Sequence, residues 1–183
     1  MAKHASTAVD PACRGFFAFG RKERWLGMAV SKRKAYGGKV ESFVKKCERS
    51  LAAAGWAHGL PAAAVAFLSL IWAPLSKGAF RHLRAGCPLD GAEELRFACY
   101  FTYFRWNRRP IVFEILSHRV GVELTEAEYA LFLERSRALE AQGFRVVRIT
   151  DVELAYARKH VYERAAYAMS RSGWGDEGWG TAI

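Results

Sequence analysis

Residues 111–116, IVFEIL, are the most informative part of the chain, because they combine the apolar composition of a buried β-strand with one acid, Glu114, near the centre. The preceding run LRFACYFTYFRW (95–106) alternates in the same way, and NRRP (107–110) between the two runs is typical of a turn. We therefore expect a β-hairpin whose strands are so apolar that each is covered on both faces over part of its length. One face of the first strand would carry Leu95, Phe97, Cys99, Phe101 and Tyr103.

Glu114 requires an explanation, because burying a carboxylate is costly unless it meets a cation, a metal ion or backbone donors. One interpretation is a structural ion pair across the sheet, and another is a side chain that the alternation directs to solvent. A third places Glu114 in a functional cleft. The nearby residues that could balance its charge are His118, Arg135, Arg137 and Arg148.

Helices and one more strand are predicted after the hairpin. Two capping boxes, in which a threonine is followed three residues later by a glutamate, mark helix starts at Thr125 and Thr150. Gly143 is placed to end the first helix, and FRVVRI (144–149) is typical of a short strand. Residues 93–169 are therefore expected to form a β-β-α-β-α core.

The N-terminal side is predicted to be mostly helical. Apolar residues recur at helical spacing from Val40, and Gly55 follows where a C-terminal cap belongs. A second helix is expected within the apolar run 60–75, beginning at Pro61 and ending before Pro74. That run falls short of the roughly 18 to 20 residues of a membrane span, although its basic flank permits a peripheral contact with a membrane.

These elements predict one α+β domain over residues 15–169, in which a basic, mostly helical part (15–90) packs on the β-hairpin-α-β-α core (93–169). Residues 1–14 lack the apolar core of a signal peptide and are expected to be a flexible lead-in. The glycine- and tryptophan-rich residues 170–183 are expected to be a flexible tail. A chain of 183 residues with 51% apolar composition is sufficient for one such core.

The cysteines and two of the tryptophans are predicted to be structural. The cysteines form no CxxC pair and have no neighbouring CxxH, so neither a zinc site nor a redox pair is indicated. Free thiols favour a reducing cytoplasm, with the periphery of the inner membrane as the alternative location. Trp72 and Trp106 are expected to pack in the core. The cysteines are Cys13, Cys47, Cys87 and Cys99.

The net charge of +10 predicts a polyanion or an anionic surface as partner. The first 60 residues hold 12 Lys and Arg against 4 Asp and Glu, so most of the excess lies there. The run 20–39 interleaves basic residues with Trp25 and Tyr36, which suits phosphate contacts assisted by base stacking. A solvated basic face packed by its aromatic side chains is the alternative. The predicted DNA-binding residues are Arg21, Lys22, Arg24, Lys32, Arg33 and Lys34.

A functional cleft is predicted at the open end of the hairpin, where Glu114 and His118 would face ERSR (134–137) of the following helix. Carboxylates beside arginines can hold a divalent metal ion and stabilise the charge that develops on a phosphate. The chain contains no GxxxxGK[ST], GxGxxG, GxSxG or HExxH motif, so other common chemistries are not indicated. The predicted catalytic residues are Glu114, His118, Glu134, Arg135 and Arg137, with Glu114 and Glu134 as metal ligands.

The runs FEILSHRV (113–120) and ERSRALEAQGFRVVRI (134–149) resemble the ParB/sulfiredoxin fold. Members of that fold have a strand leading into a G-[HSC]-R type turn, and the ParB branch continues with an arginine-rich helix and a short apolar strand. Ser117 stands where that turn has glycine. The resemblance implies ATP as a cofactor, with Ser117, His118 and Arg119 binding the nucleotide.

The run LEAQGFRVVRI (139–149) is also similar to L-x-x-x-G-[FY]-x-V-x-R-[IF] of small PD-(D/E)xK nucleases related to mismatch-repair endonucleases. The run 95–104 has no Asp, and Ile115 and Leu116 follow Glu114 where that family's lysine would stand. This second resemblance therefore implies a nuclease fold with a degraded catalytic centre.

As a whole, this basic, alanine- and arginine-rich chain resembles the plasmid-encoded fertility-inhibition proteins of the Osa (oncogenic suppression) type. The resemblance implies a conjugation inhibitor that blocks transfer of rival DNA through type IV secretion, acting as a magnesium-assisted DNA endonuclease with ATP hydrolysis. DNA and a coupling component of the secretion system are the expected partners. The alternative is a non-catalytic inhibitor that binds DNA or a secretion component and has a degenerate nuclease fold.

Overall fold

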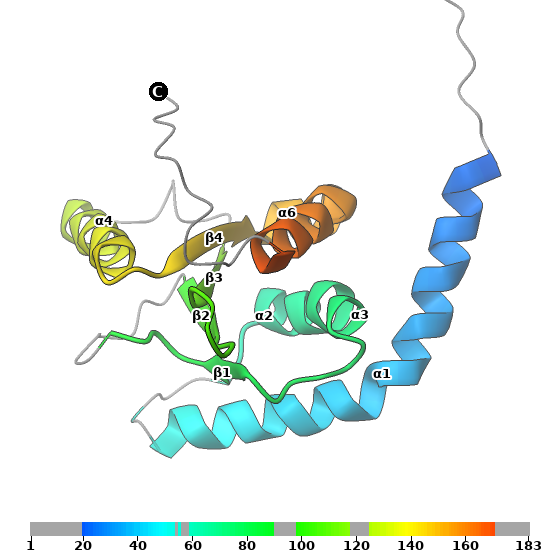
Figure 1. Cartoon of the computed structure of the whole chain (residues 1–183), viewed down its shortest axis with the longest axis horizontal. Helices are drawn as coiled ribbons and strands as arrows, with labels where there is room; N and C mark the ends of the chain where they lie inside the picture. The colour runs from blue at the N-terminus through cyan, green and yellow to red at the C-terminus, as the bar shows by residue number, and fades with distance from the viewer. Residues whose placement is uncertain (1–19, 54, 56–58, 90–97, 118–124, 171–183) are drawn as a thin grey trace, which may run out of the picture.

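The computed structural model describes residues 20–53, 55, 59–89, 98–117 and 125–170, with side chains described from residue 35 onward. Its centre is a four-stranded sheet in the order β1-β2-β3-β4 (Figure 1). The β1–β2 and β2–β3 pairs are antiparallel, and the β3–β4 pair is parallel. The strands are β1 (Leu83–Ala85), β2 (Ala98–Tyr103), β3 (Ile111–Leu116) and β4 (Arg145–Thr150).

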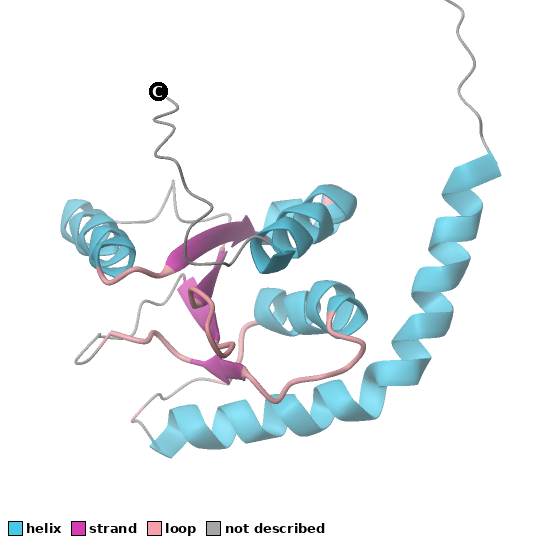
Figure 2. Ribbon diagram, in the orientation of Figure 1, coloured by secondary structure: helices cyan, strands magenta, loops and turns pink. Residues whose placement is uncertain are grey.

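Helices cover both faces of the sheet, as Figure 2 shows. On one face α4 (Glu126–Ala141) packs against β4. The other face is covered by the run α2–η1–α3 and by α5 and α6, while α1 (Gly20–Ala53) packs on β1 and η1. This is the predicted α+β fold, with helices before a β-β-α-β-α core. The remaining elements are α2 (Ala62–Phe67), the π-helical turn η1 (Leu68–Trp72), α3 (Ala73–Leu75), α5 (Asp151–Tyr156) and α6 (Arg158–Ser170).

β3 is buried along its whole length, because it lies between β2 and β4 and helices cover both of its faces. Phe113 and Ile115 point into the larger core beneath α2–η1, whereas Val112 and Leu116 point into the smaller core beneath α4. The predicted hairpin and its coverage on both faces are confirmed for β2 and β3. The expected core residues Leu95 and Phe97 lie outside the described residues.

Aromatic side chains of the helices fill the larger core. The Phe67 ring centroid lies 5.7 Å from that of Phe101 and 5.2 Å from that of Phe113. The ring of Trp72 lies 5.8 Å from Phe113, and its indole N–H donates a hydrogen bond to the Ala79 carbonyl at 3.0 Å. Trp72 therefore packs in the core as expected, with its polar atom satisfied.

The expectation that the second helix ends before Pro74 is wrong, because the helical run continues from residue 62 to residue 75. The turn before this proline is wide, and the Ala73 N–H donates to the Leu68 carbonyl five residues back. In a regular α-helix the Pro74 ring would press against the Leu70 carbonyl, and its nitrogen has no hydrogen to donate. A π-helical turn at this point accommodates the proline without ending the helix.

Both predicted capping boxes are confirmed. The Thr125 hydroxyl accepts a hydrogen bond from the Glu128 N–H at 3.2 Å, and the Glu128 carboxylate accepts one from the Thr125 N–H at 2.9 Å. Thr150 and Glu153 repeat this exchange at 3.1 and 2.9 Å. α4 is followed by Gly143 in the left-handed region (φ 84°), as its place in the sequence predicts.

Three elements differ from the sequence prediction. The expected single last helix is divided at Ala157 (φ −120°, ψ 32°), which lets α5 pack on α2 while α6 packs on η1 and β4. No strand is predicted at β1, because a strand of three residues is too short to show the alternation typical of a β-strand. It forms because these residues pair with the edge of β2. α1 begins at Gly20, before the apolar pattern, and bends near its middle (Figure 1), where Gly37 and Gly38 follow each other.

We expect Gly78→Ala to lower the free energy of unfolding more than Gly143→Ala does. Both glycines have positive φ (74° and 84°), so each alanine carries a backbone penalty of about 1–2 kcal/mol. A Cβ at position 78 would also meet the Tyr36 ring at 2.8 Å, whereas nothing lies within 4 Å of a Cβ at position 143. Urea unfolding followed by circular dichroism measures both losses. Equal losses would mean that the turn at Gly78 moves freely away from α1.

Candidate functional site

A row of three polar side chains crosses the sheet beneath α4. Tyr100, Glu114 and Arg148 are register partners on β2, β3 and β4. Glu114 is completely buried, and Arg148 Nε donates a hydrogen bond to Glu114 Oε2 at 3.0 Å. The predicted ion pair across the sheet is confirmed, and the interpretation of Glu114 as a solvent-facing carboxylate is wrong.

α4 adds charge to this row. Arg135 is buried, and its guanidinium carbon lies 5.8 Å from the centroid of the Tyr100 ring. Arg148 also approaches α4, with its Nη2 atom 3.7 Å from Glu140 Oε1. We call Tyr100, Glu114, Arg135 and Arg148 the buried polar cluster, and it joins three strands to the helix that covers them.

Burial perturbs the ionisation of this cluster. Burial raises the pKa of Glu114 above the ordinary 4.5, and the Tyr100 hydroxyl, the Arg148 guanidinium and the more distant Arg135 charge oppose the rise. Burial also raises the pKa of Tyr100, and the Glu114 charge adds to that rise. The Tyr100 hydroxyl and Glu114 Oε1 are buried, and neither makes a hydrogen bond of good geometry with the described residues. Arg148 therefore holds the carboxylate through Oε2, and the Tyr100 hydroxyl compensates only part of the cost of its burial.

The predicted catalytic residues are divided between the interior and the surface. Glu114 and Arg135 are buried, whereas Glu134 and Arg137 are exposed on α4. A metal ion needs several oxygen ligands together, and no group of three or more His, Cys, Asp or Glu among the described residues could hold one. Glu114 and Glu134 do not fit one shared ion, and magnesium binding stays a prediction.

Two predicted groups fall wholly or partly outside the described residues. His118 and Arg119 lie outside them, and Ser117, which follows β3, is half-buried. The nucleotide site and ATP therefore stay predictions. The predicted DNA-binding side chains also lie outside the described part of the chain, although their backbone forms the N-terminal half of α1. They are Arg21, Lys22, Arg24, Lys32, Arg33 and Lys34.

A groove of about 510 Å³ runs between α1 and the turn before β1. The rings of Phe43 and Phe80 stack across it with centroids 4.6 Å apart, which fixes the turn on the helix. All charged side chains of the lining are exposed cations, so the groove can hold an anion. We call it the basic groove, and its cations are Lys39, Lys46 and Arg49 of α1 and Arg81 of the turn.

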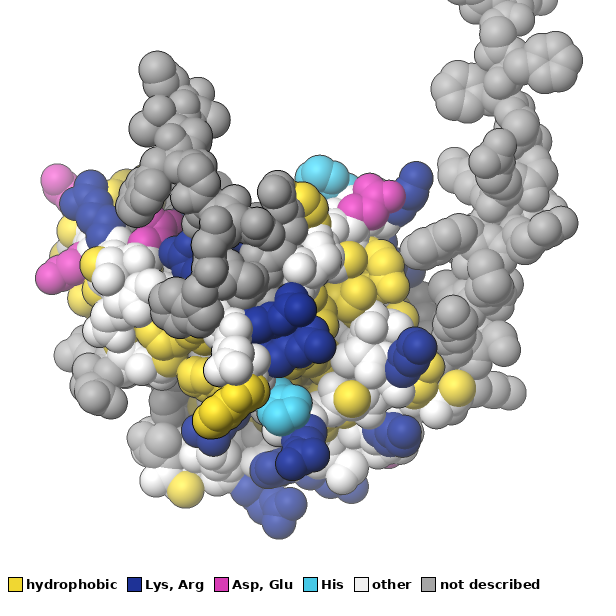
Figure 3. Space-filling view, viewed as in Figure 1, with side chains coloured by type: hydrophobic (Ala, Val, Ile, Leu, Met, Phe, Trp, Pro, Cys, Tyr) yellow, Lys and Arg dark blue, Asp and Glu magenta, His cyan; other side chains and the backbone are white. Residues whose placement is uncertain are grey.

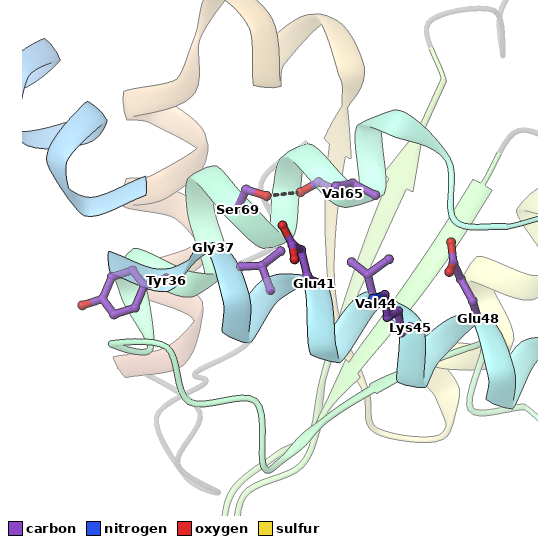
Figure 4. A pocket seen from close by; sticks show the side chains of 9 residues that line it. Tyr36, Gly37, Glu41, Val44, Lys45, Glu48, Val65 and Ser69 are labelled. Carbon is purple, nitrogen blue, oxygen red and sulfur yellow. Dashed lines mark hydrogen bonds between the residues drawn. The ribbon is translucent and has the colours of Figure 1, made fainter. Parts of the chain in front are cut away.

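The opposite flank of α1 is mixed in charge. A pocket of about 440 Å³ lies there between α1 and the run α2–η1, as Figure 4 shows. Two acids, Glu41 and Glu48, lie beside Lys45 in its lining. Ser69, across the pocket, donates its hydroxyl hydrogen to the Val65 carbonyl at 2.8 Å, a bond within its own helix. The cationic flank of α1 is therefore the one that lines the basic groove.

The turn that lines the basic groove is joined to the β2–β3 hairpin. The Phe104 N–H donates to the His82 carbonyl at 2.9 Å, and the Arg84 guanidinium carbon lies 5.4 Å from the centroid of the Phe104 ring. Two residues further on, Trp106 is 89% exposed. The expectation that Trp106 packs in the core is wrong, because β2 ends three residues earlier and the chain then turns out into solvent.

Charge is unevenly distributed over the surface. The described residues between 49 and 113 contain no Asp or Glu. Figure 3 shows Lys and Arg side chains from the middle of this face down to its lower edge, over β1 and α1, while acidic side chains lie mainly near α4 and α6. The described basic residues of this part are Arg49, Lys77, Arg81, Arg84, Arg105, Arg108 and Arg109.

Sequence reasoning missed the basic groove because its walls come from two separate segments. One signal was present, since Lys39, Lys46 and Arg49 are spaced by seven and three residues, which places them on one side of a helix. No spacing in the sequence predicts that Arg81 lies near these cations, because the stacking of Phe80 on Phe43 of α1 brings it to the basic groove.

No protein-family model, curated protein sequence or solved structure matches this chain. Within the described residues no helix combines the length and the apolar character needed to cross a membrane.

We expect Glu114→Gln to change how stability depends on pH. Because burial raises the pKa of Glu114, the folded state holds this proton more tightly than the unfolded state does. The stabilisation by this carboxyl is fully present below its unfolded pKa of about 4.5 and is lost as the pH rises through the folded value. The unfolding free energy of the wild-type protein should therefore fall relative to the variant as the pH rises.

Urea titrations at a series of pH values measure this difference. Glu134→Gln, which changes an exposed carboxylate of the same type, is the control and should leave the pH dependence nearly unchanged. A difference between wild type and Glu114→Gln that stays constant with pH would contradict the raised pKa.

Proposed function

We propose that this chain binds DNA and holds the phosphate backbone in the basic groove. The observation that carries the proposal is the lining, in which every charged side chain is a cation. Lys39 and Arg49 are ten residues apart on α1, which is about 15 Å along the helix axis. In duplex DNA each strand has one phosphate per about 3.4 Å of the duplex axis, so cations spread over this length can lie beside several phosphates. Cations in such a line suit backbone contacts that are independent of base sequence.

In this proposal the basic residues 21–34 extend the DNA-binding surface. They belong to α1, the same helix that forms one wall of the basic groove. The N-terminal half of α1 projects from the body of the protein (Figure 1), so a long polyanion can follow the helix beyond the groove. The excess of positive charge in the first 60 residues supports this extension.

Binding without catalysis agrees better with the observed geometry than cleavage does. Glu114, the acid on which the nuclease resemblance depends, is completely buried and paired with Arg148. We therefore propose a DNA-binding inhibitor that does not cleave DNA. More widely, we propose an Osa-type fertility-inhibition factor with a ParB/sulfiredoxin-like fold. It would act in the cytoplasm, either on DNA destined for type IV secretion or on the coupling component of the secretion system. The succession β3–α4–β4 supports that fold, because the resemblance requires a strand, a helix and a strand there.

We expect Lys46→Ala to weaken DNA binding and Lys45→Ala to leave it nearly unchanged. The two lysines are neighbours, but Lys46 lines the basic groove, whereas Lys45 lies with Glu41 and Glu48 on the other flank. Loss of one phosphate contact should reduce the slope of log K against log salt concentration by roughly 0.9 for duplex DNA. Fluorescence anisotropy with a labelled duplex over a range of sodium chloride concentrations measures the slope.

A substitution in the turn before β1, which forms the second wall of the basic groove, tests the proposal independently of α1. Arg81→Glu places an anion opposite Lys46 and should weaken binding more than Lys46→Ala does, because it adds repulsion of phosphate to the loss of a cation. Equal effects of Lys45→Ala and Lys46→Ala would contradict the proposal, since they would mean that DNA responds only to the total charge of the protein.

A second candidate function is DNA cleavage, which is favoured by the exposure of Glu134 and Arg137 on α4. Both side chains are accessible to a phosphate, and the Osa-type resemblance implies magnesium and ATP as cofactors of such a reaction. Glu134→Ala would then abolish cleavage of supercoiled or circular single-stranded DNA and leave DNA binding intact. Glu126→Ala, another exposed carboxylate of α4, is the control. Retained binding without cleavage under any condition would leave DNA binding as the function.

A further inference from the structure

The tip of the β2–β3 hairpin, residues 104–110, presents an aromatic ring to solvent. Trp106 is 89% exposed, whereas Trp72 in the core is 1% exposed. Asn107 beside it occupies the left-handed region (φ 55°), which asparagine tolerates better than most residues, and so makes the sharp turn. The indole contributes nothing to the core, and its faces are open to a ligand.

The hairpin tip is tied to the body of the protein on both sides of the sheet. Arg108 Nη1 donates to the Ser170 carbonyl at the end of α6 at 3.2 Å. Arg109 Nε donates to the Gly143 carbonyl, in the turn between α4 and β4, at 2.7 Å. These bonds limit the conformations of the tip, so Trp106 loses little conformational entropy when it binds.

The charged residues near the exposed ring in the chain and on the adjoining strand are basic. Arg105, directly before Trp106, is exposed, and Arg84 lies over the neighbouring Phe104 ring. The described residues 98–113 contain no Asp or Glu. The hairpin tip therefore suits a ligand that combines a flat ring with negative charge.

The hairpin tip adjoins the basic groove. The Phe104 N–H, at the base of the tip, donates to the His82 carbonyl, and His82 is next to Arg81 in the groove lining. The Arg81 side of the basic groove therefore lies beside the base of the hairpin tip.

We propose that Trp106 stacks on an unpaired base of a single-stranded nucleic acid whose phosphates lie in the basic groove. This inference rests on the proposed function and adds to it tighter binding of single strands than the basic groove alone provides. Stacking on an aromatic side chain needs an open base face, and in a duplex the neighbouring base pairs cover those faces. An anionic membrane fits less well, because an interfacial anchor needs a broad apolar face, and Phe104 beside Trp106 is only 38% exposed and lies under Arg84.

Anisotropy of a fluorescein-labelled oligothymidine and of a duplex of the same length tests the inference. Trp106→Ala should weaken binding of the single strand by roughly 5- to 150-fold, as expected for the loss of one base stack, and should leave duplex binding nearly unchanged. Trp106→Phe, which keeps an aromatic face, should recover most of the loss. Tyr156→Ala removes an equally exposed ring (89%) outside the hairpin and should have no effect.

The outcomes separate this inference from the function on which it rests. Wild-type protein that binds neither DNA would overturn both. Binding that depends on Lys46 but not on Trp106 would overturn the stacking and leave the basic groove as the DNA site. Loss of binding to phosphatidylserine vesicles in Trp106→Ala, with unchanged binding of oligothymidine, would assign the hairpin tip to a membrane surface and overturn the inference.

Discussion

The ion pair between Glu114 and Arg148 constrains how β3 and β4 pair, and the arrangement of the sheet and α4 depends on it. A shift of β4 by one residue would turn Arg148 to the opposite face of the sheet and leave a buried carboxylate without its cation. An unpaired buried charge costs about 3–5 kcal/mol, which is a large part of the roughly 5–15 kcal/mol that stabilises a typical domain. The Arg148 side chain is 47% exposed, so most of the desolvation falls on Glu114. The pair therefore favours the observed register, in which Val147 and Ile149 also point into the larger core.

This constraint also decides which surface is available for function. The acid that suggests catalysis in the sequence is used inside the sheet, and α4 covers it with Arg135 while Glu134 and Arg137 remain in solvent. The basic groove lies elsewhere, between α1 and the turn before β1. The interior of the sheet thus provides stability and register, and the cations on α1 and on the turn before β1 provide the charge that a polyanion needs.

The packing of the turn before β1 gives the groove its shape. Phe80 stacks on Phe43 of α1, and Gly78 lies so close to Tyr36 that a Cβ would meet its ring at 2.8 Å. These contacts hold Arg81 opposite Lys46 before any ligand arrives. Binding to cations on backbone segments that packing already fixes loses less conformational entropy than ordering a flexible basic segment does. A cluster of cations on a rigid turn and helix can therefore bind more tightly than its charge alone implies.

Local patterns in the sequence account for the alternation of β2 and β3, the capping boxes at Thr125 and Thr150, and the end of α4 near Gly143. Each of these signals acts within a few residues, through side-chain period, capping hydrogen bonds or backbone freedom. The packed fold determines which of four candidate cations meets Glu114 and that β1 pairs with β2. It also decided that Arg81 faces the cations of α1 and that Trp106 stays in solvent. These outcomes depend on the packing of residues tens of positions apart, and no local pattern encodes such contacts.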